Sequence, residues 1–177
     1  MLPIKKLVLS SLFAALIALL AQISIPLPFS PVPITGQAFG IFLVGSLLEG
    51  KWSAISVLIY ILLGATGLPV FHQFQGGLHI LVGPTGGFLW GFVLGCYLQG
   101  KIMEKGNSFG ITILGMFTCM GAYFALGAPY MAFVSGLNFY QAILLGVVPF
   151  IPLDIVKLIA AATLSQAVRK RLAKAGL

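Results

Sequence analysis

The chain has 177 residues, of which 59% are hydrophobic and only 7% are charged, with ten Lys and Arg against three Asp and Glu. Its mean hydropathy is +1.09, whereas a soluble domain is about 25% charged. A chain this short cannot bury so many apolar side chains and still present a surface compatible with water. The composition therefore excludes an ordinary soluble enzyme and intrinsic disorder, and it indicates an integral membrane protein.

Six apolar segments approach the length of a membrane-spanning helix, which is about 20 residues. The first is too long for a signal peptide, and no small-residue cleavage site follows it. A proline-rich run (26–33) follows the first helix, and a Gly-rich loop (68–84) follows the third. We expect residues 1–177 to form a single all-α membrane domain. The six expected helices cover residues 6–25, 34–48, 52–67, 85–103, 109–133 and 152–170.

The charged residues define a topology. Eleven of the thirteen lie before the first segment, between the second and third, at the end of the fourth, or after the sixth, which is one side of the membrane if six spans alternate. The loops of the other side, residues 26–35, 68–84 and 134–140, contain no Lys, Arg, Asp or Glu. Under the positive-inside rule, both termini are then cytoplasmic.

The two remaining charged residues, Asp154 and Lys157, lie within the sixth segment. Each costs roughly 2.5–3.5 kcal/mol to insert at the centre of a membrane helix, so such residues face a partner or a cavity. Their i, i+3 spacing puts both on one helix face. One interpretation is a self-neutralising ion pair that fixes this helix to a neighbour. We favour the other, a polar floor for a ligand site open to the outside, because Pro149 and Pro152 interrupt the backbone just before it.

Other chemistry is only weakly indicated. Cys96 and Cys119 lie within apolar segments and are expected to be free, buried thiols. His72 and His79 have no Cys, Asp or Glu nearby in the sequence, so we expect loop hydrogen bonds and no metal site. The sequence shows neither a nucleophile–base arrangement nor a Walker A motif, so we expect no enzyme and no cofactor. The basic residues form no patch suited to nucleic acid.

Four motifs occur in register along the chain: P-V-P-I-T-G-Q (31–37), G-L-P-V-F (67–71), G-P-T-G-G (83–87) and P-F-I-P-L-D-I-V-K (149–157). Together they resemble the BioY family, the biotin-specific substrate-binding (S) components of energy-coupling factor (ECF) transporters. The resemblance implies six helices in the S-component fold and a biotin pocket near the outer face, capped by loops, in the cytoplasmic membrane of a bacterium. It also implies an ECF module, a transmembrane coupling protein with two ATPase subunits, that drives release inward.

The resemblance further implies the site residues. The acidic residue and the lysine of the family's last helix fall on Asp154 and Lys157, and its polar residue before a Gly-Gly pair falls on Gln75. The Ala-x-x-x-Ala face by which S components dock on the module matches Ala14 and Ala18. Phe71, Phe88, Trp90 and Tyr123 are candidate apolar walls of the pocket. The full ligand-binding set is Asp154, Lys157, Gln75, Gly76, Gly77, Gln37, Phe88 and Tyr123.

Alternative functions stay open at this level. The chain could be an S component for a different vitamin, or a stand-alone biotin transporter without an ATPase partner. A membrane enzyme or assembly factor that uses Asp154 as a proton acceptor is a third alternative, but the sequence offers it no second catalytic group.

Overall fold

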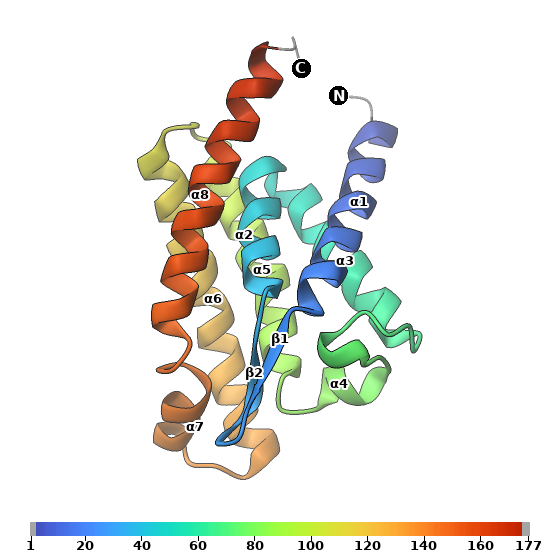
Figure 1. The fold of residues 1–177 in the computed structure, drawn as a ribbon, viewed down its shortest axis with the longest axis vertical. Helices are drawn as coiled ribbons and strands as arrows, with labels where there is room; N and C mark the ends of the chain where they lie inside the picture. Colours follow the sequence, from blue (N-terminus) through green and yellow to red (C-terminus); the bar gives the residue numbers. More distant parts are fainter. Residues whose placement is uncertain (1–2, 175–177) are drawn as a thin grey trace.

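The computed structural model describes residues 3–174, and side chains within residues 4–171. In this range the chain forms eight α-helices, a short 3-10 helix η1 (His72–Phe74) and a two-stranded hairpin (Figure 1). The expected helical segments correspond to six of the helices, whereas α4 and α7 are short additions. The α-helices are α1 (Pro3–Ala21), α2 (Gln37–Leu47), α3 (Gly50–Ala65), α4 (Leu78–Val82), α5 (Gly86–Met103), α6 (Phe109–Ser135), α7 (Phe139–Gly146) and α8 (Ile151–Lys174).

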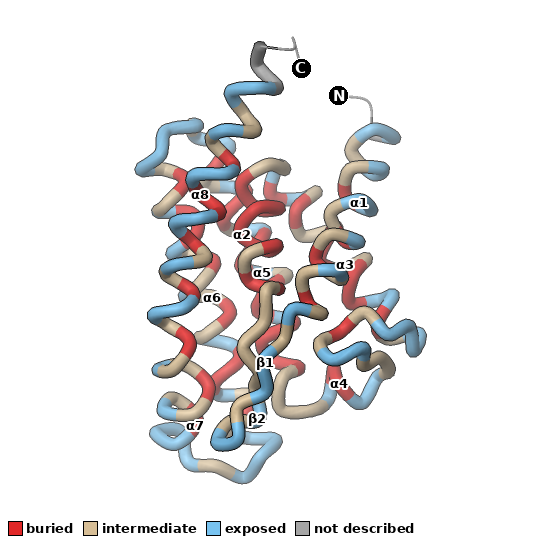
Figure 2. Tube along the Cα trace, viewed as in Figure 1, coloured by how far each residue is buried: buried red, intermediate tan, exposed pale blue. Residues whose placement is uncertain are grey.

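The surface of the helical bundle suits a lipid environment. By length and composition, three of the described helices could cross a membrane, over Ile4–Ala21, Phe109–Ser135 and Ile151–Arg171. Large apolar side chains such as Leu114 and Val156 are exposed on the long helices. Helix α2 is instead enclosed, since residues 40–46 are all buried (Figure 2). A layer of lipid-facing helices thus surrounds a short central helix.

The charged residues outside α8 gather at the end of the bundle that holds both termini. Lys6 of α1 forms an ion pair with Glu49, which joins α2 to α3. Lys101 pairs with Glu104, and Glu104 also accepts a hydrogen bond from the backbone N–H of Gly50. These contacts connect the start of α1, the start of α3 and the end of α5. The side chain of Lys174 and residues 1–2 and 175–177, which belong to the expected charge pattern and domain, lie outside the described part.

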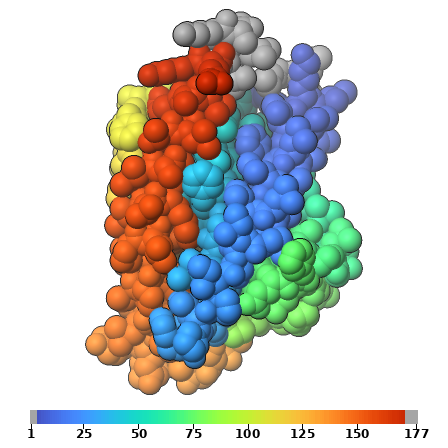
Figure 3. All heavy atoms as spheres, in the orientation of Figure 1, coloured from blue at the N-terminus to red at the C-terminus, as the bar shows by residue number. Residues whose placement is uncertain are grey.

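A β-hairpin covers the opposite end. Strands β1 (Ser24–Leu27) and β2 (Ser30–Thr35) pair antiparallel over the proline-rich run that follows α1. Proline cannot donate to a strand ladder, so it is tolerated in an isolated pair whose outer edges are free. The Ser30 hydroxyl donates to the carbonyl of Leu145 in α7 at 2.8 Å. On the molecular surface the hairpin lies between α8 and the segment that contains α4 (Figure 3).

Glycine allows α5 to approach α6 closely. Gly87, Gly91 and Gly95 recur every fourth residue, a spacing that favours close contact between membrane helices. A Cβ at Gly91 would lie 2.6 Å from the Cα of Tyr123, and one at Gly95 would lie 2.7 Å from the Sγ of Cys119. Any side chain at Gly91 would therefore push against the backbone of α6, which carries Tyr123 into the interior.

Gly91→Ala is expected to destabilise the protein by about 1–3 kcal/mol, because the added methyl group meets backbone that cannot rotate away. Thermal unfolding in detergent measures this loss. Gly121→Ala on α6 is the matched control, since Gly121 is exposed and a Cβ there has no neighbour within 4 Å. Equal melting temperatures for the two variants would contradict the close contact between α5 and α6.

Candidate ligand-binding site

Asp154 and Lys157 form an ion pair in the first two turns of α8. The Nζ of Lys157 donates to Oδ1 of Asp154 at 2.7 Å, and the hydroxyl of Tyr123 donates to Oδ2 at 2.6 Å. Asp154 is only 4% exposed, whereas the Lys157 side chain is 18% exposed. The ion pair proposed from the sequence therefore exists, and a third side chain, from α6, completes it.

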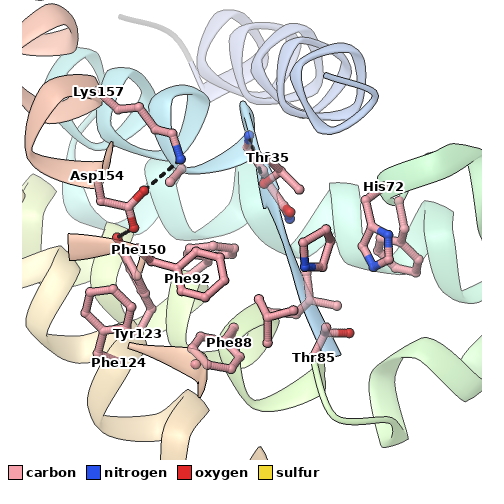
Figure 4. A pocket seen from close by; sticks show the side chains of 17 residues that line it. Thr35, His72, Thr85, Phe88, Phe92, Tyr123, Phe124, Phe150, Asp154 and Lys157 are labelled. Carbon is pink, nitrogen blue, oxygen red and sulfur yellow. Dashed lines mark hydrogen bonds and ion pairs between the residues drawn. The ribbon is translucent and has the colours of Figure 1, made fainter. Parts of the chain in front are cut away.

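This polar group faces a cavity, as the second interpretation of the sequence requires. The empty space of this cavity, with its opening to solvent included, is about 590 Å³. Residues of α2, α5, α6, α7, α8, the hairpin strand β2 and the loop after α3 line it (Figure 4). Its aromatic wall consists of Phe71, Phe88, Phe92, Tyr123, Phe124 and Phe150.

Aromatic packing orients the Tyr123 hydroxyl. The Tyr123 ring lies 4.9 Å from that of Phe92 at an interplanar angle of 64°, and 4.6 Å from that of Phe124 at 56°. Such tilted arrangements are the favourable ones for aromatic pairs. The ring is thus held between two neighbours, and its hydroxyl points to Asp154.

Five of the eight expected ligand-binding residues line this cavity: Asp154, Lys157, Gln37, Phe88 and Tyr123. Gln37 is buried and donates from its amide to the Tyr60 hydroxyl at 3.1 Å, which fixes its orientation.

Three expected residues lie elsewhere. Gln75 lines a second, outer pocket and does not reach the inner cavity. Gly76 and Gly77 line neither pocket and instead shape the loop. A Cβ at Gly76 would lie 2.2 Å from the carbonyl oxygen of Leu68, and Gly77 has φ +110°. These three residues therefore do not line the inner cavity, and their expected part in ligand binding stays a prediction.

Two of the candidate walls differ. Phe71 is 1% exposed and lines the cavity, as expected. Trp90 is 45% exposed, so the prediction that it forms a wall is wrong. The cavity residues that the sequence analysis missed include Thr35, Thr85 and Phe150. Each lies within one of the four motifs, and that position could have identified them.

His72 also lines the cavity, where only a loop hydrogen bond was expected. Both ring nitrogens are buried and have no hydrogen-bond partner among the described residues, so that expectation is wrong. Burial lowers the pKa of the His72 imidazole below its ordinary value, which keeps the ring neutral near pH 7.

An outer pocket adjoins the inner cavity. The hairpin and the loop between α3 and α5 line it, with Gln75 and His79 among its polar groups. Three residues line both spaces, namely Pro33, His72 and Thr85. These three side chains therefore form the boundary between the inner cavity and the outer pocket.

The two alanines of the expected docking face on α1 both face at least partly into the bundle. Ala14 is fully buried on the inward side of α1, and Ala18 is half-buried against the core. The exposed small residues of this helix are Ser11 and Ala15. Ala14 is therefore not accessible to a partner in this conformation.

The described residues contain no group of three or more His, Cys, Asp or Glu that could hold a metal ion. Cys96 and Cys119 are free and buried, which confirms the expectation for the thiols.

A bundle of apolar helices that encloses a cavity, with the ion pair of an apolar helix in the cavity wall, is typical of a membrane protein that binds a solute. Comparison with known proteins identifies the family within this class. A profile described as the BioY family matches residues 1–174, and the chain belongs to this family. The resemblance found in the four motifs is thereby confirmed.

The chain is similar to proteins of known name over nearly its whole length. It is 43% identical to the biotin transporter BioY of Thermotoga maritima over 171 residues, which covers 94% of this chain and 96% of that protein. It is 40% identical to the biotin transporter BioY of Rhizobium etli, over 93% of this chain and 92% of the other.

A solved structure is also similar. The crystal structure of the S component for biotin from an ECF-type ABC transporter superposes with a TM-score of 0.87 at 28% identity. The match covers 94% of this chain and 92% of that one. The expected all-α S-component fold is therefore confirmed.

Proposed function

We propose that the chain is a biotin-binding S component, which captures biotin for uptake by an ECF-type transporter. The observation that carries this proposal is the hydrogen-bonded Asp154 carboxylate within an aromatic cavity of an S-component fold. Relatives that are 43% and 40% identical are named biotin transporters. The chain is a transport protein and not an enzyme, so binding needs no covalent chemistry.

The polar groups of the cavity match the ureido ring of biotin. This ring has two N–H donors and one carbonyl acceptor. An ionised carboxylate has about four acceptor sites, and Tyr123 and Lys157 occupy one on each oxygen of Asp154. Asp154 can therefore still accept from the ureido N–H groups, while Lys157 retains N–H groups for the ureido carbonyl. The aromatic wall suits the apolar thiophane ring.

The ligand-binding set under this proposal joins Asp154, Lys157 and Tyr123 to Gln37 and Phe88. Gln75, in the outer pocket, is proposed to contact the ligand on its way in or out. Gly76 and Gly77 are proposed to act indirectly, because they let the capping loop fold tightly.

We propose that residues 1–177 are one domain in the cytoplasmic membrane of a bacterium, with both termini cytoplasmic. The charge pattern supports this orientation. The start of α1, the junction of α2 and α3 and the C-terminal ends of α5 and α8 lie at the end that holds the termini (Figure 1). These segments carry Lys6, Glu49, Lys101, Glu104 and Arg169, whereas the hairpin and the α4 segment carry no formal charge. The cavity then opens toward the outside.

The proposed partner is an ECF module, a transmembrane coupling protein with two ATPase subunits. Helix α1 offers Ser11 and Ala15 on its exposed face. Docking through Ala14 and Ala18 stays a prediction, and it requires α1 to turn or move away from α3. Co-purification with ATPase subunits tests this partnership separately from biotin binding.

The decisive experiment is biotin titration of the protein purified in detergent. We expect saturable binding of one biotin per chain, without competition from thiamine or riboflavin. Absence of biotin binding by folded protein would overturn the proposal. Displacement of biotin by another vitamin would point to a different S-component specificity.

A further inference from the structure

The unpaired imidazole of His72 requires an explanation. Both of its nitrogens are buried, and no described residue bonds them. Native proteins pair almost all of their buried polar groups, because an unpaired one loses its hydrogen bonds to water without compensation. A polar ligand group would supply the missing partner, since a neutral imidazole has one N–H donor and one acceptor.

The position of His72 points to the far end of a ligand. It lines both the inner cavity and the outer pocket. Figure 4 shows His72 across the cavity from Asp154 and Lys157, with Thr35 and Thr85 between them. The cavity therefore has polar groups at both ends, and Phe88 and Phe92 also lie between those ends.

The loop around His72 is held in an unusual conformation. Gln73 and Phe74, which follow it, have φ values of 55° and 56°, and non-glycine residues adopt such angles only where surrounding contacts hold them. Gln22 at the end of α1 supplies such contacts. Its amide nitrogen donates to the carbonyls of Val70 and Phe71 at 3.2 and 3.0 Å, and its oxygen accepts from the Phe74 N–H at 2.9 Å. The backbone on both sides of His72 is thus fixed.

We propose that His72 binds the carboxylate at the end of the ligand's tail, while the Asp154 end holds the ureido ring. This inference rests on the proposed function, biotin binding. A second carboxylate beside buried Asp154 would place two like charges together, which a buried site strongly disfavours. Lys157 is the one Lys or Arg among the described residues that line either pocket, and Asp154 already pairs with it. The tail carboxylate therefore lies at the opposite end, where His72 donates a hydrogen bond to it.

The groups that face His72 agree with this assignment. His79, Gln75 and Gln73 line the outer pocket beside it, and Thr85 lines both spaces. None of these side chains is acidic, so no described pocket-lining residue on this side repels an anion. His79 lines the outer pocket but not the inner cavity. A substitution of His79 is therefore a matched control for one of His72.

The test compares biotin with an analogue whose tail ends in a methyl group instead of the carboxylate. His72→Phe keeps a ring but removes both nitrogens. We expect it to weaken biotin binding about tenfold to a hundredfold, the range of a hydrogen bond to a charged group, and to change the affinity for the analogue less than threefold. His72→Gln, which retains an N–H donor, should restore part of the affinity for biotin, and His79→Phe should leave it unchanged.

Retained binding of the analogue shows that the His72→Phe protein is folded. An unchanged affinity for biotin in this variant would overturn the proposal, and so would an equal loss for both ligands, because a structural role affects them alike. Failure of the unmodified protein to bind biotin is a separate result, since it refutes the proposed function itself.

Discussion

Replacing Asp154 with asparagine is expected to weaken biotin binding about 30-fold to 1,000-fold, or roughly 2–4 kcal/mol. The carboxylate accepts from Tyr123 and Lys157 and, under the proposed function, from the ureido ring as well. An amide carries no charge and offers only one acceptor oxygen. Calorimetric titration of the detergent-purified variant measures the change.

A control must separate binding from folding, because Asp154→Asn leaves Lys157 without its partner. Removing one member of a buried pair destabilises a protein, whereas removing both is often tolerated. The double variant Asp154→Asn with Lys157→Met should therefore unfold at a higher temperature than Asp154→Asn alone, yet still fail to bind biotin tightly. If either folded variant bound biotin as tightly as the unmodified protein, the role of Asp154 would be refuted.

Tyr123→Phe gives an intermediate case. It removes one of the two side-chain donors to Asp154 and leaves the aromatic packing against Phe92 and Phe124 in place. Since the ion pair with Lys157 remains, we expect this variant to bind biotin less tightly than the parent but more tightly than Asp154→Asn.

The long helices and the centre of the site could be predicted because their signals are strong and local. Apolar runs of helical length are recognisable without any knowledge of neighbours. A charge within such a run costs so much that it marks a functional position. Asp154 and Lys157 were identified in this way, and the structure places them together in a cavity wall.

The inward faces of the helices could not be predicted, because lipid is as apolar as the protein core. A soluble helix alternates polar and apolar sides, but these helices are apolar all round. Ala14 is buried while Ala15 beside it is exposed, and Phe92 lines the cavity while Trp90 is exposed. The burial of Ala14 and the exposure of Trp90 therefore could not be predicted for the same reason.

The hairpin was missed for a different reason. Its prolines argue against strands, and local sequence does not reveal that Ser30 meets Leu145, 115 residues away. The environment of His72 likewise depends on contacts between distant segments, since β2, the loop after α3 and the start of α5 meet there. Such tertiary contacts leave no pattern in the local sequence.

Gln22→Leu is expected to speed the release of bound biotin about tenfold or more. Gln22 makes three hydrogen bonds to the backbone of residues 70–74, and each such bond contributes roughly 0.5–1.5 kcal/mol. Without them fewer contacts compensate for the positive φ angles at Gln73 and Phe74, so the loop that carries Phe71 and His72 opens more often. Release of labelled biotin into excess unlabelled biotin gives the rate.

Gln166→Leu is the matched control. Gln166 also donates from its amide, to the Asn107 carbonyl and the Thr112 hydroxyl, but it lies on α8 toward the end of the bundle that holds the termini. Its loss should lower the melting temperature and leave biotin release unchanged. If both variants release biotin at the parental rate, Gln22 does not hold the loop closed. If only Gln22→Leu accelerates release, then α1, the helix proposed to dock on the ECF module, is directly linked to the loop that covers the ligand.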